Sequence, residues 1–367
     1  MYKKEDAMHQ FGWYRRLCLV PYWDGTIFFA HPKKGEKMKK MKKILCVMMA
    51  AVLALGLCAC GKEESKDKDT YKIGIIQYVS HPSLDNCYNG IMNAINASDN
   101  ADKITVDRQI GSDSAADSDC ATYAANMVSQ EYDMIIAIAT PAASAAFAAT
   151  EGTDIPVIFC AVSDPVAVEL VESMDNPGEL CTGTSDVLDM EAHVDMIQAF
   201  LPDVKTIGVV YTTSEANSIT QLGNLKTVCD ARGLTVEAVG IQNDADIPAA
   251  AQALAEKADC FLNFTDNKVV NNLSVLLEAA NAAGIPVFGS EEEQVKNGCA
   301  ASMSIDYVAL GEITGEMALD VMIDGADAKT MAVKTTSDAT PVINSKVLSD
   351  LNISVPDNYK DAVDVAE

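Results

Sequence analysis

Short apolar segments rich in β-branched residues alternate with Ala-rich helical segments along most of this chain. From Tyr71 onward, the apolar segments are IGIIQYV, DMIIAIA, PVIFCAV, TIGVVY, DCFLNF and PVFGS. Each is nearly continuous in apolar residues, which is typical of strands that helices cover on both faces. Amphipathic segments such as 123–130 and 271–283 lie between them. The alternation predicts βαβ units and a doubly wound, parallel α/β fold.

The second half of the chain repeats the pattern of the first half. YDMIIAIATPAA followed by IPVIFCAVSDP is echoed by ADCFLNFTDNK followed by IPVFGSEEE, so that Thr140 corresponds to Thr265 and Ile155 to Ile285. A generic αβ rhythm can produce such an echo by chance. Because 367 residues also exceed one comfortable hydrophobic core, we interpret the echo as two similar lobes.

The order of the segments predicts how the chain divides between the lobes. We expect a first lobe of residues 71–184 and 306–335 and a second lobe of residues 185–305 and 336–367. IDYVALGEITGEMALDVMIDG predicts a crossover followed by a helix that packs back on the first lobe. TPVINSKVLSDLNISVP predicts a last strand and a short helix. Several crossovers between two lobes would form a hinge.

Residues 1–60 have the pattern of an upstream extension followed by an export signal. Four lysines precede an uncharged run over 44–57, which is typical of the apolar region of a signal peptide. That run is too short to span a bilayer comfortably. The LCACG segment that follows resembles a bacterial lipobox and predicts lipidation of Cys60. Cys58 fits less well because Leu57 precedes it, where a small side chain is expected.

Two further segments lie outside the predicted lobes. Residues 1–37 precede an apparently complete signal peptide that begins at Met38 or Met41, so they are either a misassigned start or an unusually long n-region. Neither interpretation gives them a role in the folded protein. Residues 61–70, GKEESKDKDT, have the composition of a flexible, solvated tether.

The chain after Cys60 is strongly acidic, with 16 Lys and Arg against 49 Asp and Glu. Such a surface repels phosphate backbones and anionic lipid head groups. We therefore expect no nucleic-acid partner, and contact with the membrane only through an N-terminal lipid. The seven cysteines after Cys60 are widely spaced and odd in number, which indicates buried hydrophobic residues and not a disulfide framework.

Polar residues follow the apolar segments, at the positions where ligands bind in open α/β sheets. Their hydroxyl and N–H groups suit a carboxylate, and their carboxylates suit an ammonium group, so the pattern predicts a small zwitterionic ligand. The alternative is that they only cap helices. Convergence of both lobes on one cleft favours ligand contact. These candidate residues are His81, Ser83, Thr140, Pro141, Ala142, Ser163, Asp164, Ser214, Glu215, Asn217, Thr265, Asp266, Asn267, Ser290 and Glu291.

The motifs of several enzyme classes are missing from the sequence. It contains no GxSxG, GxxxxGKS/T, GxGxxG or HExxH, so serine hydrolysis, nucleotide chemistry and zinc proteolysis lack their usual basis. His81 and His193 are the two histidines after Cys60, and we expect neither a metal centre nor a cofactor. His193 is expected to be exposed or to pack in the fold. An enzyme remains the main rival class because fold alone does not settle function.

Eight segments, in order, resemble a known family: the type I periplasmic-binding-protein-like substrate-binding lipoproteins of ABC transporters, within them the tryptophan and tyrosine uptake group. The resemblance spans Tyr71 to Val363. The segments are KIGIIQYVSHPSLD, IIAIATPAASAA, IPVIFCAVSDPV, TGTSDV, GVVYTTSEANS, FTDNKVV, IPVFGSEEEQVKNGCAASMSIDY and LGEITGEMA.

The resemblance implies a non-enzymatic receptor that delivers its cargo to an ABC permease and ATPase. We expect it to be a monomer, extracytoplasmic and lipid-anchored to the outer face of the bacterial cell membrane. Two alternatives remain, namely a sensing lipoprotein that acts through a membrane signalling partner, and a receptor for another small polar ligand. An adjacent permease and ATPase gene would favour import.

The same resemblance implies roles for individual residues. The region of Ser83, Thr140 and Ala142 would hold the ligand carboxylate. The ammonium would contact Asp164, Asp186 or Asp266, and the second-lobe side would be closed by Glu215, Asn217 and Asn267.

An aromatic amino acid is the favoured ligand, and Tyr78 is the expected stacking surface. We expect Tyr211 and Phe264 in the core. Glu292 and Glu293 depart from the expected pattern because they make the entrance unusually acidic, which leaves the identity of the ligand open.

Overall fold

The computed structural model describes residues 70–366, except residues 115, 337 and 338. The predicted signal peptide, Cys60 and nearly all of the predicted tether lie outside the described residues. Among the residues that are described, the helices are too short or too polar to cross a bilayer.

The first sheet has six strands in the order β11-β5-β4-β3-β1-β2, and each neighbouring pair is parallel. The central strands β3 and β4 are buried along their whole length, which explains their continuous apolar sequences. The strands are β1 (Tyr71–Gln77), β2 (Ile104–Ile110), β3 (Met134–Ile138), β4 (Val157–Cys160), β5 (Cys181–Ser185) and β11 (Lys334–Thr335).

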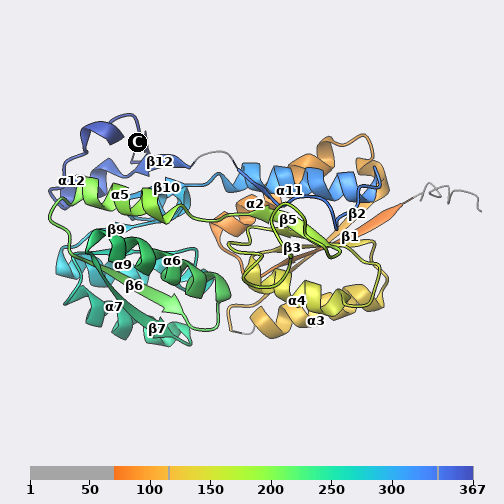
Figure 1. Ribbon diagram of the computed structural model, residues 1–367, viewed down its shortest axis with the longest axis horizontal. Helices are drawn as coiled ribbons and strands as arrows, with labels where there is room; N and C mark the ends of the chain where they lie inside the picture. Colours follow the sequence, from red (N-terminus) through yellow and green to blue (C-terminus); the bar gives the residue numbers. More distant parts are fainter. Residues whose placement is uncertain (1–69, 115, 337–338, 367) are drawn as a thin grey trace, which may run out of the picture. The chain divides into compact units, whose positions relative to one another are not determined.

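Helices cover both faces of the first sheet (Figure 1). Helices α2 (Pro82–Ala97) and α11 (Tyr307–Met322) pack together on one face. Helices α3 (Ala116–Ser129) and α4 (Thr140–Thr150) pack together on the other. Helix α11 is far from α2 in sequence, and it joins this sheet after the chain has completed most of the second one.

The second sheet has seven strands in the order β13-β12-β10-β9-β8-β6-β7. Its neighbours are parallel except for β10 and β12, which are antiparallel. The strands are β6 (Thr206–Thr212), β7 (Thr235–Ile241), β8 (Cys260–Leu262), β9 (Val287–Phe288), β10 (Ala301–Ser304), β12 (Thr340–Ile343) and β13 (Val363–Asp364). The helices are α5 (Met190–Phe200), α6 (Ala216–Arg232), α7 (Ile247–Ala255), α8 (Asn267–Asn271), α9 (Leu273–Ala283), α10 (Glu292–Lys296) and α12 (Ser345–Asp350).

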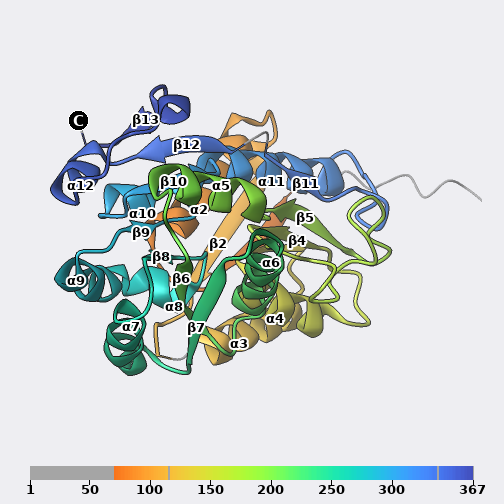
Figure 2. The same ribbon diagram turned by 60° about the vertical axis from the view of Figure 1, so that its left-hand side comes forward.

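The chain passes between the two sheets three times in the described residues: from β5 to β6, from β10 to α11, and from β11 to β12. Helix α6 of the second sheet lies beside α4 of the first (Figure 2). The predicted α/β class with two mainly parallel sheets is confirmed. The seven cysteines from Cys87 to Cys299 are buried and free, as the sequence predicts.

Glycines allow α2 and α11 to approach closely. A Cβ atom added to Gly311 would lie 2.1 Å from the carbonyl oxygen of Cys87 on α2, and one added to Gly90 would lie 2.1 Å from the carbonyl oxygen of Val308 on α11. Neither neighbour is a flexible side chain, so a methyl group at either position would push the helix backbones apart. This contact attaches α11 to the first sheet and fixes Tyr307, its first residue, close to the ends of the strands.

We expect Gly311→Ala to lower the free energy of unfolding by about 1–3 kcal/mol because its methyl group would meet the backbone of α2. Urea denaturation measures this change. Gly223→Ala is the matched control: Gly223 lies on the exposed side of α6, where a Cβ atom meets nothing within 4 Å. The control should gain about 0.5–1 kcal/mol through helix propensity. Equal stability of Gly311→Ala and wild type would contradict the close helix contact.

Candidate functional site

The carboxyl ends of strands from both sheets surround a cavity with an empty volume of about 350 Å³. Nine of the seventeen side chains predicted for the ligand site line it: His81, Ser83, Thr140, Ser163, Asp186, Asn217, Thr265, Asn267 and Glu291. Residues from both sheets thus converge on one cavity, which helix capping alone would not require.

Two helices begin at the cavity without a side-chain cap. Neither α2 nor α4 has a side chain that accepts a hydrogen bond from its first-turn N–H groups. Helices α5 and α11, by contrast, are capped by Asp189 and Asp306. The hydroxyls of Ser83 and Thr140, in the first turns of α2 and α4, are buried without a hydrogen-bond partner. The partial positive charge and free donors of these helix ends suit an anionic group.

Two alanines of the cavity wall have backbone conformations that residues other than glycine rarely adopt. Ala139, directly after β3, has φ +80°, and Ala161, directly after β4, has φ +56°. Such conformations cost about 1–3 kcal/mol each and persist where the surrounding structure enforces them, commonly at binding sites. The strained turns direct the starts of α4 and of the loop containing Ser163 toward the cavity.

Asp186 is a buried carboxylate with two fixed hydrogen-bond donors. The hydroxyl of Ser163 donates to its Oδ1 at 2.9 Å, and the hydroxyl of Tyr307 donates to its Oδ2 at 2.9 Å. Since Gln221 donates to Ser163 Oγ at 3.1 Å, the serine proton is directed at Asp186. Burial raises the pKa of Asp186, and these two hydroxyl donors oppose the rise. The two hydroxyl donors favour the ionised form of Asp186, and no Lys or Arg lines the cavity of the described chain.

The orientation of the Asn267 amide determines the proton position on His81. Asn267 Nδ2 donates to Glu215 at 2.6 Å, so its Oδ1 faces His81 Nε2 at 3.3 Å and accepts the proton that this nitrogen carries. Burial lowers the pKa of His81 to about 4, which keeps the ring neutral at pH 7. Nδ1 is therefore an acceptor, and it is buried without a partner.

Glu215 lies behind the cavity wall and holds two amides in place. It accepts hydrogen bonds from the side chains of Asn267 and Asn217, at 2.6 and 3.2 Å. Burial, and then the neighbouring carboxyl of Asp266, raises the pKa of Glu215 to about 8, while the bonds from the two asparagines oppose that rise. With Asn217 Nδ2 occupied in this way, Asn217 Oδ1 remains a buried acceptor without a partner in the cavity wall.

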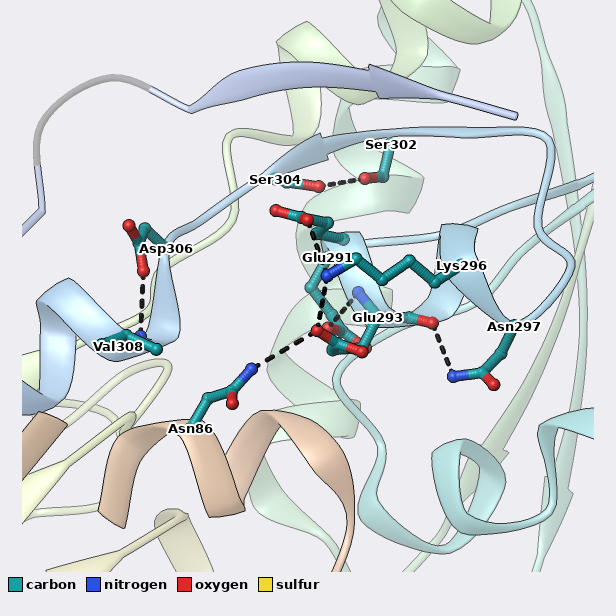
Figure 3. A network of polar contacts seen from close by, with 10 residues as sticks. Asn86, Glu291, Glu293, Lys296, Asn297, Ser302, Ser304, Asp306 and Val308 are labelled. Carbon is teal, nitrogen blue, oxygen red and sulfur yellow. Dashed lines mark hydrogen bonds and ion pairs between the residues drawn. The ribbon is translucent and has the colours of Figure 1, made fainter. Parts of the chain in front are cut away.

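Hydrogen bonds join the two sheets around the cavity. His81 meets Asn267 at 3.3 Å and Gln221 donates to Ser163 at 3.1 Å, on the two sides of the site. Farther out, Asn271 donates to Asp113 at 2.9 Å and Asn86 donates to Glu293 at 3.5 Å (Figure 3). These contacts enclose the cavity between the sheets.

Eight predicted residues lie outside the cavity. Tyr78 is fully buried beside a separate small hollow, so its ring offers no stacking surface in the cavity. The carboxyl of Asp266 is saturated by hydrogen bonds from Thr212, Ser218 and the N–H group of Val269. Through the bond from Val269, Asp266 caps α8. Asp164 accepts a hydrogen bond from Ala167 in its own loop. The others also follow strand ends but are not part of the cavity wall: Pro141, Ala142, Ser214, Glu215 and Ser290. Of the three acids considered for the ammonium, Asp186 alone lines the cavity.

Six residues of the cavity wall were not among the predicted site residues: Leu84, Ala139, Ala161, Val270, Gln294 and Tyr307. Tyr307 follows the end of β10, a strand end that sequence reasoning did not use for the site. Gln294 lies three residues after Glu291, on the same face of a helix turn, which is a usable signal. The four apolar residues carry no chemical signal in the sequence.

The chain belongs to the family described as ABC transporter substrate binding protein, whose model matches residues 72–365. The homologues found are substrate-binding proteins and not enzymes. A tyrosine-binding protein of Clostridioides difficile (strain R20291) is 35% identical over 332 residues, which cover 86% of this chain and 94% of the relative.

Two solved structures are similar to this chain at nearly equal sequence identity. One is an ABC domain from Streptococcus pneumoniae in complex with L-Trp, with 33% identity and a TM-score of 0.76. The other is a ligand-free, open substrate binding protein with adhesive properties from Clostridium difficile, with 34% identity and a TM-score of 0.62. Each comparison covers 80% of this chain and 98% of the other.

The stability of the chain should depend on pH through Glu291. Burial raises the pKa of its carboxyl from 4.5 to about 7, and the neighbouring hydroxyl of Ser83 and the N–H group of Glu293 oppose that rise. Because the folded chain binds this proton more tightly than the unfolded chain, the contribution of Glu291 to the free energy of unfolding falls as pH rises from about 4.5 to about 7. The Glu291→Gln variant lacks this contribution, so its free energy of unfolding should fall less than that of wild type over this pH range. The two falls should differ by about 3 kcal/mol at most.

Urea denaturation at several pH values measures the difference between the two proteins. Glu215 and His81 also titrate differently in the folded chain, but they contribute equally to both profiles. Glu292→Gln is the matched control, since Glu292 is half exposed and pairs with Lys296. Parallel profiles for Glu291→Gln and wild type would show that folding does not raise the pKa of Glu291.

Proposed function

We propose that this protein is the extracytoplasmic receptor of an ABC importer and that it binds an amino acid, most favourably an aromatic one, in the cavity between its sheets. Each sheet with its helices acts as one lobe. The first lobe comprises residues 71–184 and 306–335, and the second comprises residues 185–305 and 336–367. The three chain crossings would form the hinge about which the lobes open and close.

The observation that carries the proposal is the set of buried polar atoms without partners in the cavity wall. They are the hydroxyls of Ser83 and Thr140, Nδ1 of His81, Oδ1 of Asn217 and Oε1 of Glu291. Buried polar groups are normally hydrogen-bonded, and each unsatisfied one costs about 1–3 kcal/mol. A polar ligand that supplies partners to several of these atoms would remove this cost.

An α-amino acid matches the distribution of these groups. Its carboxylate would meet the first turns of α2 and α4, where Ser83 and Thr140 add hydroxyl donors. Its ammonium would supply the positive charge that Asp186 lacks and would donate to an acceptor such as Asn217. Leu84, Ala139, Ala161 and Val270 would cover an apolar side chain. The names of the relatives support an aromatic ligand, since one is a tyrosine-binding protein and another was solved with L-Trp.

The enclosed form of the cavity supports capture by closure. The chain is more similar to the L-Trp complex than to the open, ligand-free structure, although both are equally related in sequence. The hydrogen bonds His81 to Asn267 and Gln221 to Ser163 would form as the lobes close. The ligand would then leave when a permease and its ATPase open the lobes.

Export and anchoring complete the proposal. Cys60 follows a signal-peptide run and would carry the lipid that holds the receptor at the outer face of the membrane. The charged segment 61–70 would act as a tether, and the receptor would work as a monomer without a cofactor. Each buried lipid methylene contributes about 0.8 kcal/mol, so durable anchoring needs more than one acyl chain.

The wild-type protein should show a higher melting temperature with L-tyrosine, L-tryptophan or L-phenylalanine in a panel of amino acids and nucleobases. A ligand that binds only the closed, folded form stabilises it by mass action. Asp186→Asn should weaken binding of the ligand so identified roughly 10- to 100-fold, because an ammonium loses its charged partner. Isothermal titration calorimetry measures the affinities.

Asp203→Asn is the control, because Asp203 is exposed in the loop that enters β6, at the end of the strand away from the cavity. It should bind like wild type. No thermal shift with any amino acid would refute the ligand class, and full affinity in Asp186→Asn would remove the assigned role of Asp186.

A further inference from the structure

The cavity contains one acidic group more than the head group of an amino acid requires. Asp186 and Glu291 both line it, whereas an α-amino acid has a single ammonium. Both oxygens of Asp186 already accept hydroxyl donors, which favours its ionised form. Glu291 differs because its Oε2 accepts from the N–H group of Glu293 at 3.0 Å, while its Oε1 is buried without a partner. The role of the second carboxyl therefore needs a separate explanation.

Glu291 has no cationic partner in the described part of the chain. Lys296, on the helix that Glu291 caps, pairs instead with Glu292 at 2.8 Å. It also pairs with Glu293 at 2.9 Å (Figure 3). Burial raises the pKa of Glu291 to about 7, so a neutral form is accessible near neutral pH. In either protonation state an oxygen of this carboxyl can accept a hydrogen bond from a neutral donor.

Glu291 lies beside the hydroxyl of Ser83, but it belongs to a different sheet from Thr140 and Asp186. Thr140 and Asp186 follow strands of the first sheet, whereas Glu291 follows β9 of the second. The carboxylate and ammonium of an amino acid share one carbon atom, so neighbouring groups must bind both. Glu291 also borders a second hollow of about 670 Å³, which shares His81, Ser83, Val270 and Gln294 with the cavity. Asp186 and Thr140 do not line this second hollow, so Glu291 borders space that these two groups do not reach.

We propose that Glu291 is a specificity-determining residue that accepts a hydrogen bond from a donor on the ligand side chain, the phenol O–H of tyrosine or the indole N–H of tryptophan. This inference rests on the proposed function and assigns the substrate class more narrowly. Phenylalanine would leave the buried Oε1 unsatisfied, and sites built to hydrogen-bond a substrate group discriminate strongly against analogues that lack it. The acidic group then explains ligand choice without a second ligand charge.

The test compares the affinities of L-tyrosine, L-tryptophan, L-phenylalanine and O-methyl-L-tyrosine by isothermal titration calorimetry. Wild type should bind tyrosine or tryptophan at least about 10-fold more tightly than phenylalanine, and O-methylation of tyrosine should remove most of its advantage. Glu291→Leu should bring the ratio between the preferred ligand and phenylalanine close to one, through a loss for the preferred ligand alone. Glu291→Gln retains a side-chain oxygen and should keep part of the ratio.

Glu292→Gln is the matched control and should leave the ratio unchanged, since its half-exposed side chain lies outside the cavity wall. Melting temperatures without ligand identify any variant that does not fold, and Glu291→Gln then provides the comparison. An equal loss for all ligands, or an unchanged ratio in both Glu291 variants, would overturn this inference while aromatic amino acids still bind. A wild-type protein that binds no aromatic amino acid would overturn both the proposed ligand and the role of Glu291.

Discussion

The site depends on the start of two uncapped helices at the same edge of one parallel sheet. Parallel strands bring the ends of β1 and β3 together, and α2 and α4 begin there with free N–H groups and the unpartnered hydroxyls of Ser83 and Thr140. An anion can be bound by these groups without an Arg or Lys in the cavity wall. This arrangement allows an acidic protein to hold a carboxylate.

The two acidic side chains of the cavity wall, Asp186 and Glu291, have different hydrogen-bond partners. Asp186 accepts hydrogen bonds from Ser163 and Tyr307, and these two donors favour its charged form. Glu291 has a free oxygen and a raised pKa, and it suits a neutral donor. Two carboxyl groups in one cavity thus acquire different roles because their hydrogen-bond partners differ, which is a recurring principle of tuned sites. The glycine contact between α2 and α11 holds Tyr307 near Asp186, and it thereby supports the role of Asp186.

The sequence predicts the fold better than it predicts the site. Continuous apolar runs and their spacing determine which segments become parallel strands, and strand ends determine where polar residues gather. Side-chain direction after a strand is not encoded in that pattern: Asp266 and Asp186 are similar in sequence context, but Asp266 is saturated as a helix cap. Ala139 and Ala161 enter the cavity wall through unusual backbone angles, and Tyr307 enters through a helix that returns from the other sheet. These features depend on tertiary contacts.

A crystal structure of the protein grown with L-tyrosine or L-tryptophan tests the central claim most directly. The account predicts the amino acid in the cavity between the sheets, with its carboxylate at the first turns of α2 and α4 and its ammonium within hydrogen-bond distance of Asp186. An amino acid bound elsewhere, or bound in the cavity with its carboxylate away from both helix ends, would contradict it.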